Sequence, residues 1–162
     1  MGKQSVAIIR ETAFGVLPVT PTFQNIRHTS CNLALNKNSS LSEELRQDRQ
    51  VTGFKHGSES TSGDLSFKFS ATTFDDFLES ALGGTWAANV LRTGGVRRSY
   101  LIEKYLADLL PADEPWHRFS GCEINAFSLS VPVEGDVSGS FSFMGKDLTV
   151  NNAIISGANY NP

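Results

Sequence analysis

The chain has 162 residues, of which 40% are hydrophobic and 19% are charged, a composition typical of one folded domain and not of a disordered segment. Fourteen Lys and Arg against 17 Asp and Glu give a formal net charge of -3. This balance excludes a tight, non-specific nucleic-acid binder, because such binding needs excess positive charge to neutralise phosphates.

The sequence carries no signal for a membrane or for secretion. No stretch supplies the roughly 20 apolar residues of a membrane-spanning helix, and MGKQSVAIIRE becomes charged too early for a secretory signal. Two cysteines, Cys31 and Cys122, are too few for a disulfide scaffold. We therefore expect a reduced product of the cytoplasm with no membrane binding by this chain.

The first 23 residues combine an apolar run, Val6 to Ile9, with an arm in which Pro18 and Pro21 exclude helix. Such an arm has few hydrogen bonds of its own, so we expect it to lie against its own sheet or a neighbouring molecule. The polar stretch 36–63 is long for a loop without structure. It predicts a functional segment or a protruding hairpin.

The next two segments predict a strand and a helix. Residues 62–71 alternate with a period of two, which is typical of a half-buried strand. Its inward side would carry Leu65, Phe67, Phe69 and Ala71. In the helix that follows, Thr73 would act as the N-cap, Asp75 and Asp76 would occupy the first turn, and Gly83-Gly84 would end it.

Three further strands are expected, one from Val96 to Tyr105 and a hairpin of Glu123 to Val133 with Asp136 to Phe143. The odd-numbered side of the hairpin would face the core: Phe127, Leu129, Val131, Val137, Phe141 and Phe143. The even-numbered side is mostly serine. After Val150 no period continues, so we expect that segment to be loose or to dock on a partner.

These elements predict a mainly β fold, an antiparallel β-sandwich or flattened barrel with one flanking α-helix and a long protruding loop or hairpin. We expect one domain over residues 1–150, with an N-terminal arm at 1–23 and a long loop at 36–63. Residues 151–162 would form a C-terminal tail.

Candidate enzyme sites are weak. The pairs His28 with Cys31 and His117 with Cys122 supply zinc-type ligands, but their spacings fit no common zinc module. A cysteine within an apolar strand is more often a small core residue, and nothing local supplies the base of a thiol nucleophile. We therefore expect no catalytic residues, no metal and no cofactor.

Charged and aromatic groupings leave binding alternatives open. One basic cluster with interleaved tyrosines could stack single-stranded bases: Arg97, Arg98, Tyr100, Lys104 and Tyr105. The usual role of such a strand is an exposed edge. Trp86 and Trp116 leave a β-sandwich glycan-binding module open as a function. The serine sides of the strands, short and uncharged, indicate a smooth neutral wall or merely a serine-rich surface.

Four segments together resemble the tail tube proteins, or major tail proteins, of long-tailed, siphovirus-type bacteriophages. They are PTFQNIRHTS, SEELRQDRQVTG, SGDLSFKFSATTFDDFLESALGGTW and FSLSVPVEGDVSGSFSFMGK, in this order and over nearly the whole chain. The resemblance implies a non-enzymatic structural protein of the virion tail, assembled in the bacterial host cytoplasm. Its copies would form rings, typically of six tube domains, that stack into a hollow conduit for double-stranded DNA.

The resemblance also implies roles for particular residues. Candidate lumen-lining residues are Ser66, Ser70, Ser128, Ser130, Ser138, Ser140 and Ser142. Candidate contacts between subunits and rings, on the arm and on the long loop, are Phe14, Val16, Leu17, Phe23, Glu43, Glu44, Arg46, Asp48 and Arg49.

The implied partners are further copies of the chain, other tail proteins (tape measure, distal tail and tail terminator) and DNA in transient, non-specific passage. Family members often continue into a second, similar half, so rings of six and of three chains both stay open. A related completion or tube-end protein that forms a single ring is an alternative.

Overall fold

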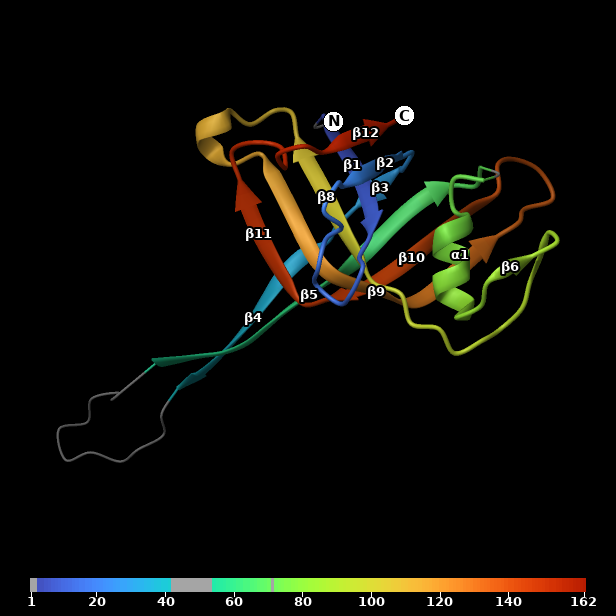
Figure 1. Ribbon diagram of the computed structural model, residues 1–162, viewed down its shortest axis with the longest axis horizontal. Helices are drawn as coiled ribbons and strands as arrows, with labels where there is room; N and C mark the ends of the chain where they lie inside the picture. The colour runs from blue at the N-terminus through green and yellow to red at the C-terminus, as the bar shows by residue number, and fades with distance from the viewer. Residues whose placement is uncertain (1–2, 42–53, 71) are drawn as a thin grey trace.

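The computed structural model describes residues 3–41, 54–70 and 72–162 (Figure 1). Within these ranges a ten-stranded sheet runs in the order β12-β2-β1-β8-β9-β10-β5-β3, with β11 paired to β9 and β4 to β5. Strands β6 and β7 form a separate hairpin. Every pair is antiparallel except β12 with β2. The predicted mainly β fold with a flanking helix and a protruding hairpin is confirmed.

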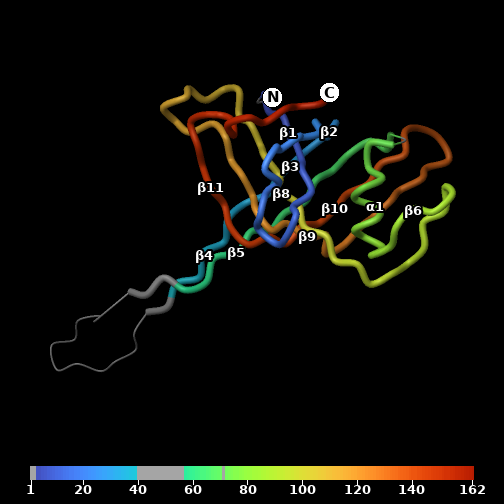
Figure 2. Tube along the Cα trace, in the orientation of Figure 1, coloured from blue at the N-terminus to red at the C-terminus, as the bar shows by residue number. Residues whose placement is uncertain are grey.

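The long sheet bends into two walls that share β9 (Figures 1 and 2). The first wall consists of β1 (Gln4–Arg10), β2 (Thr22–Ile26), β8 (Tyr100–Leu106), β12 (Asn159–Asn161), β11 (Asp147–Asn151) and the first half of β9 (Trp116–Ser130). The second consists of the rest of β9, β10 (Ser138–Gly145), β5 (Phe54–Lys68), β3 (Ser30–Cys31) and β4 (Ala34–Leu41). The remaining elements are α1 (Asp75–Leu82), β6 (Trp86–Ala87), β7 (Val90–Leu91) and a 3-10 turn (Pro111–Asp113).

The apolar core lies between the two walls, and α1 completes it. The ring of Phe77 on α1 lies 5.2 Å from the ring of Tyr100 on β8. The same ring lies 5.1 Å from Phe141 and 5.4 Å from Phe143, both on β10. One helical side chain therefore ties the first wall to the second.

Strand β1 is buried on both faces. Val6 and Ile8 point into the main core, whereas Ala7 and Ile9 point into a smaller cluster on the other side, with Phe23 and Leu101. A strand covered on both faces carries a continuous apolar run and no alternation. This explains why the sequence here is VAII.

The start of α1 differs from the prediction. Thr73 does not cap the helix; its hydroxyl donates to Ser70 Oγ at 3.4 Å, and the N-cap position belongs to Phe74. Phe74 is fully buried beside Phe67, with ring centroids 4.1 Å apart. Burying an aromatic ring stabilises more than the roughly 1 kcal/mol of a side-chain cap, so core packing sets where the helix begins. Its end is as predicted, at a left-handed Gly83.

The C-terminal segment also differs from the expectation. It is not loose, because β12 adds to β2 of the same chain as a parallel edge strand. The ring of Tyr160 stacks on Phe23 at 5.1 Å, and its hydroxyl donates to Glu103 Oε1 at 2.5 Å. A strand of three residues is too short to show a period, so the sequence pattern does not reveal it.

Replacing Tyr160 with phenylalanine should lower the free energy of unfolding by about 1–3 kcal/mol, because a buried carboxylate oxygen loses its donor. Glu103 is 1% exposed, and its other oxygen accepts from Arg118 Nε at 2.7 Å. Urea unfolding followed by fluorescence measures the loss. Tyr105→Phe is the matched control, since the Tyr105 hydroxyl has no hydrogen-bond partner within the described ranges. Equal losses in both variants would contradict the assigned bond.

Candidate functional site

Six of the seven candidate serines lie on one face of β5, β10 and β9. Ser140 on β10 is opposite Ser128 of β9 on one side and Ser66 of β5 on the other. Ser138 is likewise opposite Ser130 and Lys68. We call this surface the hydroxyl face; its serines are Ser66, Ser128, Ser130, Ser138, Ser140 and Ser142. The reverse of the same strands carries Phe67 and Phe141, which are buried in the core.

Several polar side chains of the hydroxyl face form hydrogen bonds or ion pairs with one another. The hydroxyls of Ser128 and Ser140 are 2.9 Å apart, and Ser142 donates to the carboxylate of Asp64. At the end of the face, Lys68 Nζ lies 2.5 Å from Asp136 Oδ2. This contact raises the pKa of Lys68 and lowers that of Asp136, first by hydrogen bonding and then by charge attraction. The charge of Lys68 is therefore paired within the chain.

Two of these groups extend the predicted site. Asp64 and Lys68 alternate with Ser66 along β5, so the period of two places them on the same face. Ser30 of β3, opposite Ser66, lengthens the row by one strand. The alternation was sufficient to find Asp64 and Lys68, whereas Ser30 depends on a strand pairing that the sequence does not reveal.

Ser70 is the exception among the serines. Strand β5 ends at Lys68, so Ser70 lies beyond the sheet, half-buried, and accepts from Thr73. Phe69, expected to face the core, is 43% exposed for the same reason. Ala71, which was also expected on the inward side of this strand, lies outside the described residues.

The outer part of the β9–β10 hairpin also corrects the prediction. Leu129 is 46% exposed and Val131 is more exposed still, although their odd positions predict burial. The turn spans residues 131–137 and is not confined to Glu134 and Gly135, because β9 ends at Ser130 and β10 begins at Ser138. The hairpin thus projects beyond the part of the sheet that the core covers.

The candidate contact residues divide into three groups. Phe14 and Val16 are exposed on the arm, and Leu17 packs against the smaller apolar cluster. Phe23 is not exposed for a contact in this structure, because it is fully buried in the smaller apolar cluster with its ring stacked on Tyr160. The others lie outside the described residues: Glu43, Glu44, Arg46, Asp48 and Arg49.

The wall that carries the hydroxyl face has two open lateral edges. β8 pairs with β9 only as far as Cys122, so within the described part of the chain residues 124–130 of β9 pair on one side alone, with β10. At the other edge, β3 and β4 pair only with β5 among the described residues. Unpaired backbone groups along a strand are a template for another strand.

The two cysteines considered for zinc or thiol chemistry are buried. Burial raises the pKa of Cys31 and raises that of Cys122 to about 12, so both remain thiols at neutral pH. His28 Nδ1 lies 3.1 Å from the carbonyl oxygen of Ile26. In the three ranges that the structure describes, no group of three His, Cys, Asp or Glu side chains is arranged to hold a metal ion.

The basic and aromatic cluster does not form one surface. Arg98 is buried, with its guanidinium 3.4 Å from Glu79, whereas Arg97 pairs with Glu123 at 2.8 Å. Tyr100 is buried in the core. Trp116 stacks on Tyr105 at 4.3 Å within the sheet.

No helix among the described residues is long and apolar enough to cross a membrane.

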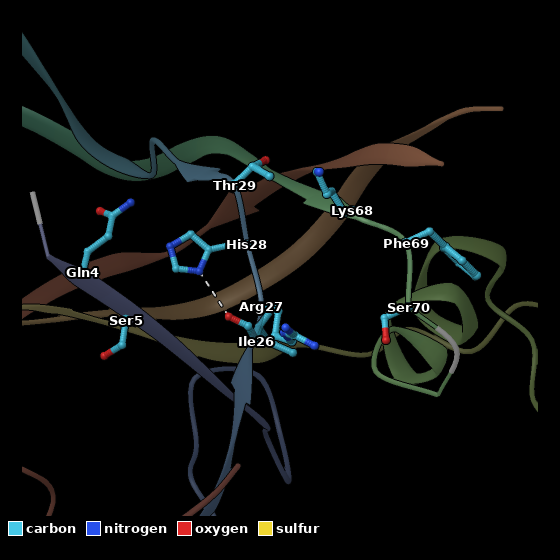
Figure 3. Close-up of a pocket in the computed structure, with 9 residues that line it drawn as sticks. All are labelled: Gln4, Ser5, Ile26, Arg27, His28, Thr29, Lys68, Phe69 and Ser70. Carbon is cyan, nitrogen blue, oxygen red and sulfur yellow. Dashed lines mark hydrogen bonds between the residues drawn. The ribbon is translucent and has the colours of Figure 1, made fainter. Parts of the chain in front are cut away.

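A groove of about 630 Å³ lies where the two walls diverge (Figure 3). Gln4 and Ser5 from the start of β1 lie on one side, Lys68 to Ser70 after β5 on the other, and Ile26 to Thr29 between them (Figure 3). Its side chains are mostly polar or cationic, with Ile26 and Phe69 as the apolar residues.

The comparison with protein families is decisive. A model described as phage tail tube protein matches residues 2–162. The chain belongs to the phage tail tube protein family. It is therefore a structural, non-enzymatic subunit of a tail tube and a component of the virion tail, which confirms the resemblance of the four sequence segments. No curated protein sequence matches this tail tube subunit.

Solved structures share its fold. A chain from the virion of a native gene transfer agent particle has a TM-score of 0.55 and 12% identity, covering 80% of this chain and 88% of that chain. A chain of the anti-feeding prophage baseplate, 6-fold symmetrised, has a TM-score of 0.54 and 11% identity, covering 95% and 96%. The tube-terminating cap of the anti-feeding prophage contains a chain with a TM-score of 0.51 and 8% identity, covering 91% and 88%.

Proposed function

We propose that copies of this chain close into a ring in which the hydroxyl face lines a channel for double-stranded DNA. The observation that carries the proposal is one wall with six serines in register on its exposed face and an unpaired strand at each lateral edge of the described part. If residues 124–130 of one copy paired with β3 and β4 of the next, the unpaired backbone groups at both edges would become hydrogen-bonded.

Strand direction supports this closure. β9 is antiparallel to β10, β10 to β5, and β5 to both β3 and β4. The two edges of the wall therefore run in opposite directions, so β9 of one copy meets β4 of the next as an antiparallel pair. The same contact repeats from copy to copy until the ring closes.

The chemistry of the hydroxyl face suits passage of DNA. Each cation that faces phosphate would release counterions and hold the DNA. Serine hydroxyls carry no charge, Lys68 is paired with Asp136, and Asp64 adds negative charge. Such a wall would repel phosphate weakly and bind it poorly.

We further propose that the β4–β5 hairpin stacks one ring on the next. The hairpin projects well away from the two walls (Figure 1), and Lys37 pairs with Glu59 across its strands at 2.8 Å. In this proposal the charged residues between the strands contact the next ring: Glu43, Glu44, Arg46, Asp48 and Arg49. Phe14 and Val16, exposed on the arm, add to these contacts, and the other tail proteins bind the ends of the tube.

Electron microscopy of the purified protein, combined with amide hydrogen exchange before and after assembly, tests ring closure. We expect rings or tubes, and new exchange protection on residues 124–130 and on β3 and β4. Strand β1, already paired on both sides, is the internal control and should not change. End views count the chains per ring, six or three. A protein that stays monomeric at high concentration would contradict the proposal.

Stacking is tested separately with Arg49→Glu. If the hairpin joins rings, this variant should give single rings without tubes and keep the circular dichroism of the wild type. Single rings from the wild type would instead favour the tube-end or completion protein. Tubes of normal length from Arg49→Glu would remove Arg49 from the stacking contact.

A further inference from the structure

The groove in Figure 3 is lined by a cationic side chain, Arg27, and by an apolar one, Phe69. Arg27 is exposed at its rim and pairs with no acidic group in the described parts of the chain. Ile26 borders the groove but is only 4% exposed, so the apolar surface of the groove is that of Phe69, which is 43% exposed and lies on the opposite side. The groove therefore suits a short segment that carries both an acidic group and apolar side chains.

The turn between β9 and β10 is such a segment. Val133 is fully exposed, Val131 is mostly exposed, and Glu134 lies exposed beside them without an ion pair among the described residues. The base of the turn is held in place, because Asp136 pairs with Lys68 and the Phe69 amide donates to the Val137 carbonyl at 2.8 Å. These contacts tie the base of the turn to β5, while Val131, Val133 and Glu134 remain exposed.

The strand register places this turn beside the groove of an adjacent copy. Ser30 is opposite Ser66, and the row continues through Ser140 to Ser128, so β3 begins at the level where β9 ends. If β9 of one copy pairs with β3 and β4 of the next, the turn after Ser130 reaches residues 27–30 of that next copy.

We propose that the turn of residues 131–137 in one copy seats in the groove of the adjacent copy. Val131 and Val133 cover Phe69, and Glu134 pairs with Arg27. The inference rests on the proposed ring closure and adds a second contact between adjacent copies, next to the paired strands. The occupant is a second copy of this chain, because the tip matches the groove in charge and in apolar surface, and because the contact continues the proposed interface.

A charge exchange tests the pairing of Glu134 with Arg27. Each single variant, Arg27→Glu or Glu134→Arg, should raise the concentration for half-maximal assembly about tenfold or more, because like charges then meet. The double variant should return towards the wild type. Arg92→Glu, the same charge change on an exposed residue away from the groove, is the control. Circular dichroism and thermal melting confirm that each monomer folds.

Cross-linking tests the neighbour directly. Thr29→Cys protein mixed with Val133→Cys protein should give a covalent dimer with a short bismaleimide, and neither alone should. The buried Cys31 and Cys122 leave the wild type as an unreactive control. The variant carrying both cysteines should give a ladder whose last band counts the copies.

The outcomes separate this inference from the ring itself. Wild-type rings with no cross-link, or with a cross-link only within one chain, would overturn the groove contact and leave ring closure standing. Absence of any ring or tube from the wild type would overturn both.

Discussion

Replacing Phe141 with alanine should lower the free energy of unfolding by about 3–5 kcal/mol, the usual cost of emptying a buried aromatic site. Phe141 is completely buried, and its ring lies 5.0 Å from Phe67, 5.1 Å from Phe77 and 4.8 Å from Phe127. These partners come from β5, α1 and β9, so the cavity would open where three elements meet. Urea denaturation of the monomer measures the loss.

The matched control is Leu129→Ala, on the same strand pair and at the same parity. Leu129 is 46% exposed, so its truncation should cost less than about 1 kcal/mol. If Leu129→Ala were as damaging as Phe141→Ala, the hairpin would be covered in the monomer and the assigned core would be too small.

Replacing Ser128 with lysine should convert the tube from a weak into a strong binder of double-stranded DNA. Ser128 lies on the hydroxyl face, opposite Ser140, in the edge strand β9. In the proposed ring, one substitution places a cation in every subunit. With about 6–10 phosphates contacted, affinity should fall roughly 10³- to 10⁵-fold between 50 and 200 mM salt. Mobility shift of short DNA by assembled tubes, over a salt series, measures both effects.

Ser156→Lys makes the same chemical change on an exposed loop before β12. It should leave DNA binding at the wild-type level. Equal DNA binding by the two variants would show that Ser128 does not face the channel. Loss of tubes in Ser128→Lys alone would place Ser128 in a contact between subunits.

Local periodicity predicts the site better than it predicts the fold around it. In β5 and β10, serine or charge alternates with Leu65, Phe67, Phe141 and Phe143, and the two sides of the sheet follow directly. The alternation does not show where a strand stops. Phe69 and Val131 continue the pattern in sequence, yet both lie beyond the last paired residue and are exposed.

Other features depend on residues far apart in the sequence. Glu11 is buried and accepts from the amides of Gly15 and Gly121 and from the hydroxyl of Ser99. These bonds fix the start of the arm against β9. They cannot be predicted from the local sequence pattern. A bulge between Ser142 and Phe143 likewise shifts the register, so that Ile124 and Phe143 become opposite. Only the paired strands reveal the shift.

The wall of the hydroxyl face has four strand positions, namely β9, β10, β5 and the position that β3 and β4 share, so in the proposed ring it would repeat with even parity. An odd number of strands would make every junction between copies parallel. With even parity, a tandem duplication that joined two such units in one polypeptide would preserve every junction. In the proposed ring, half as many chains of doubled length would therefore give the same hydrogen-bonding pattern of the wall.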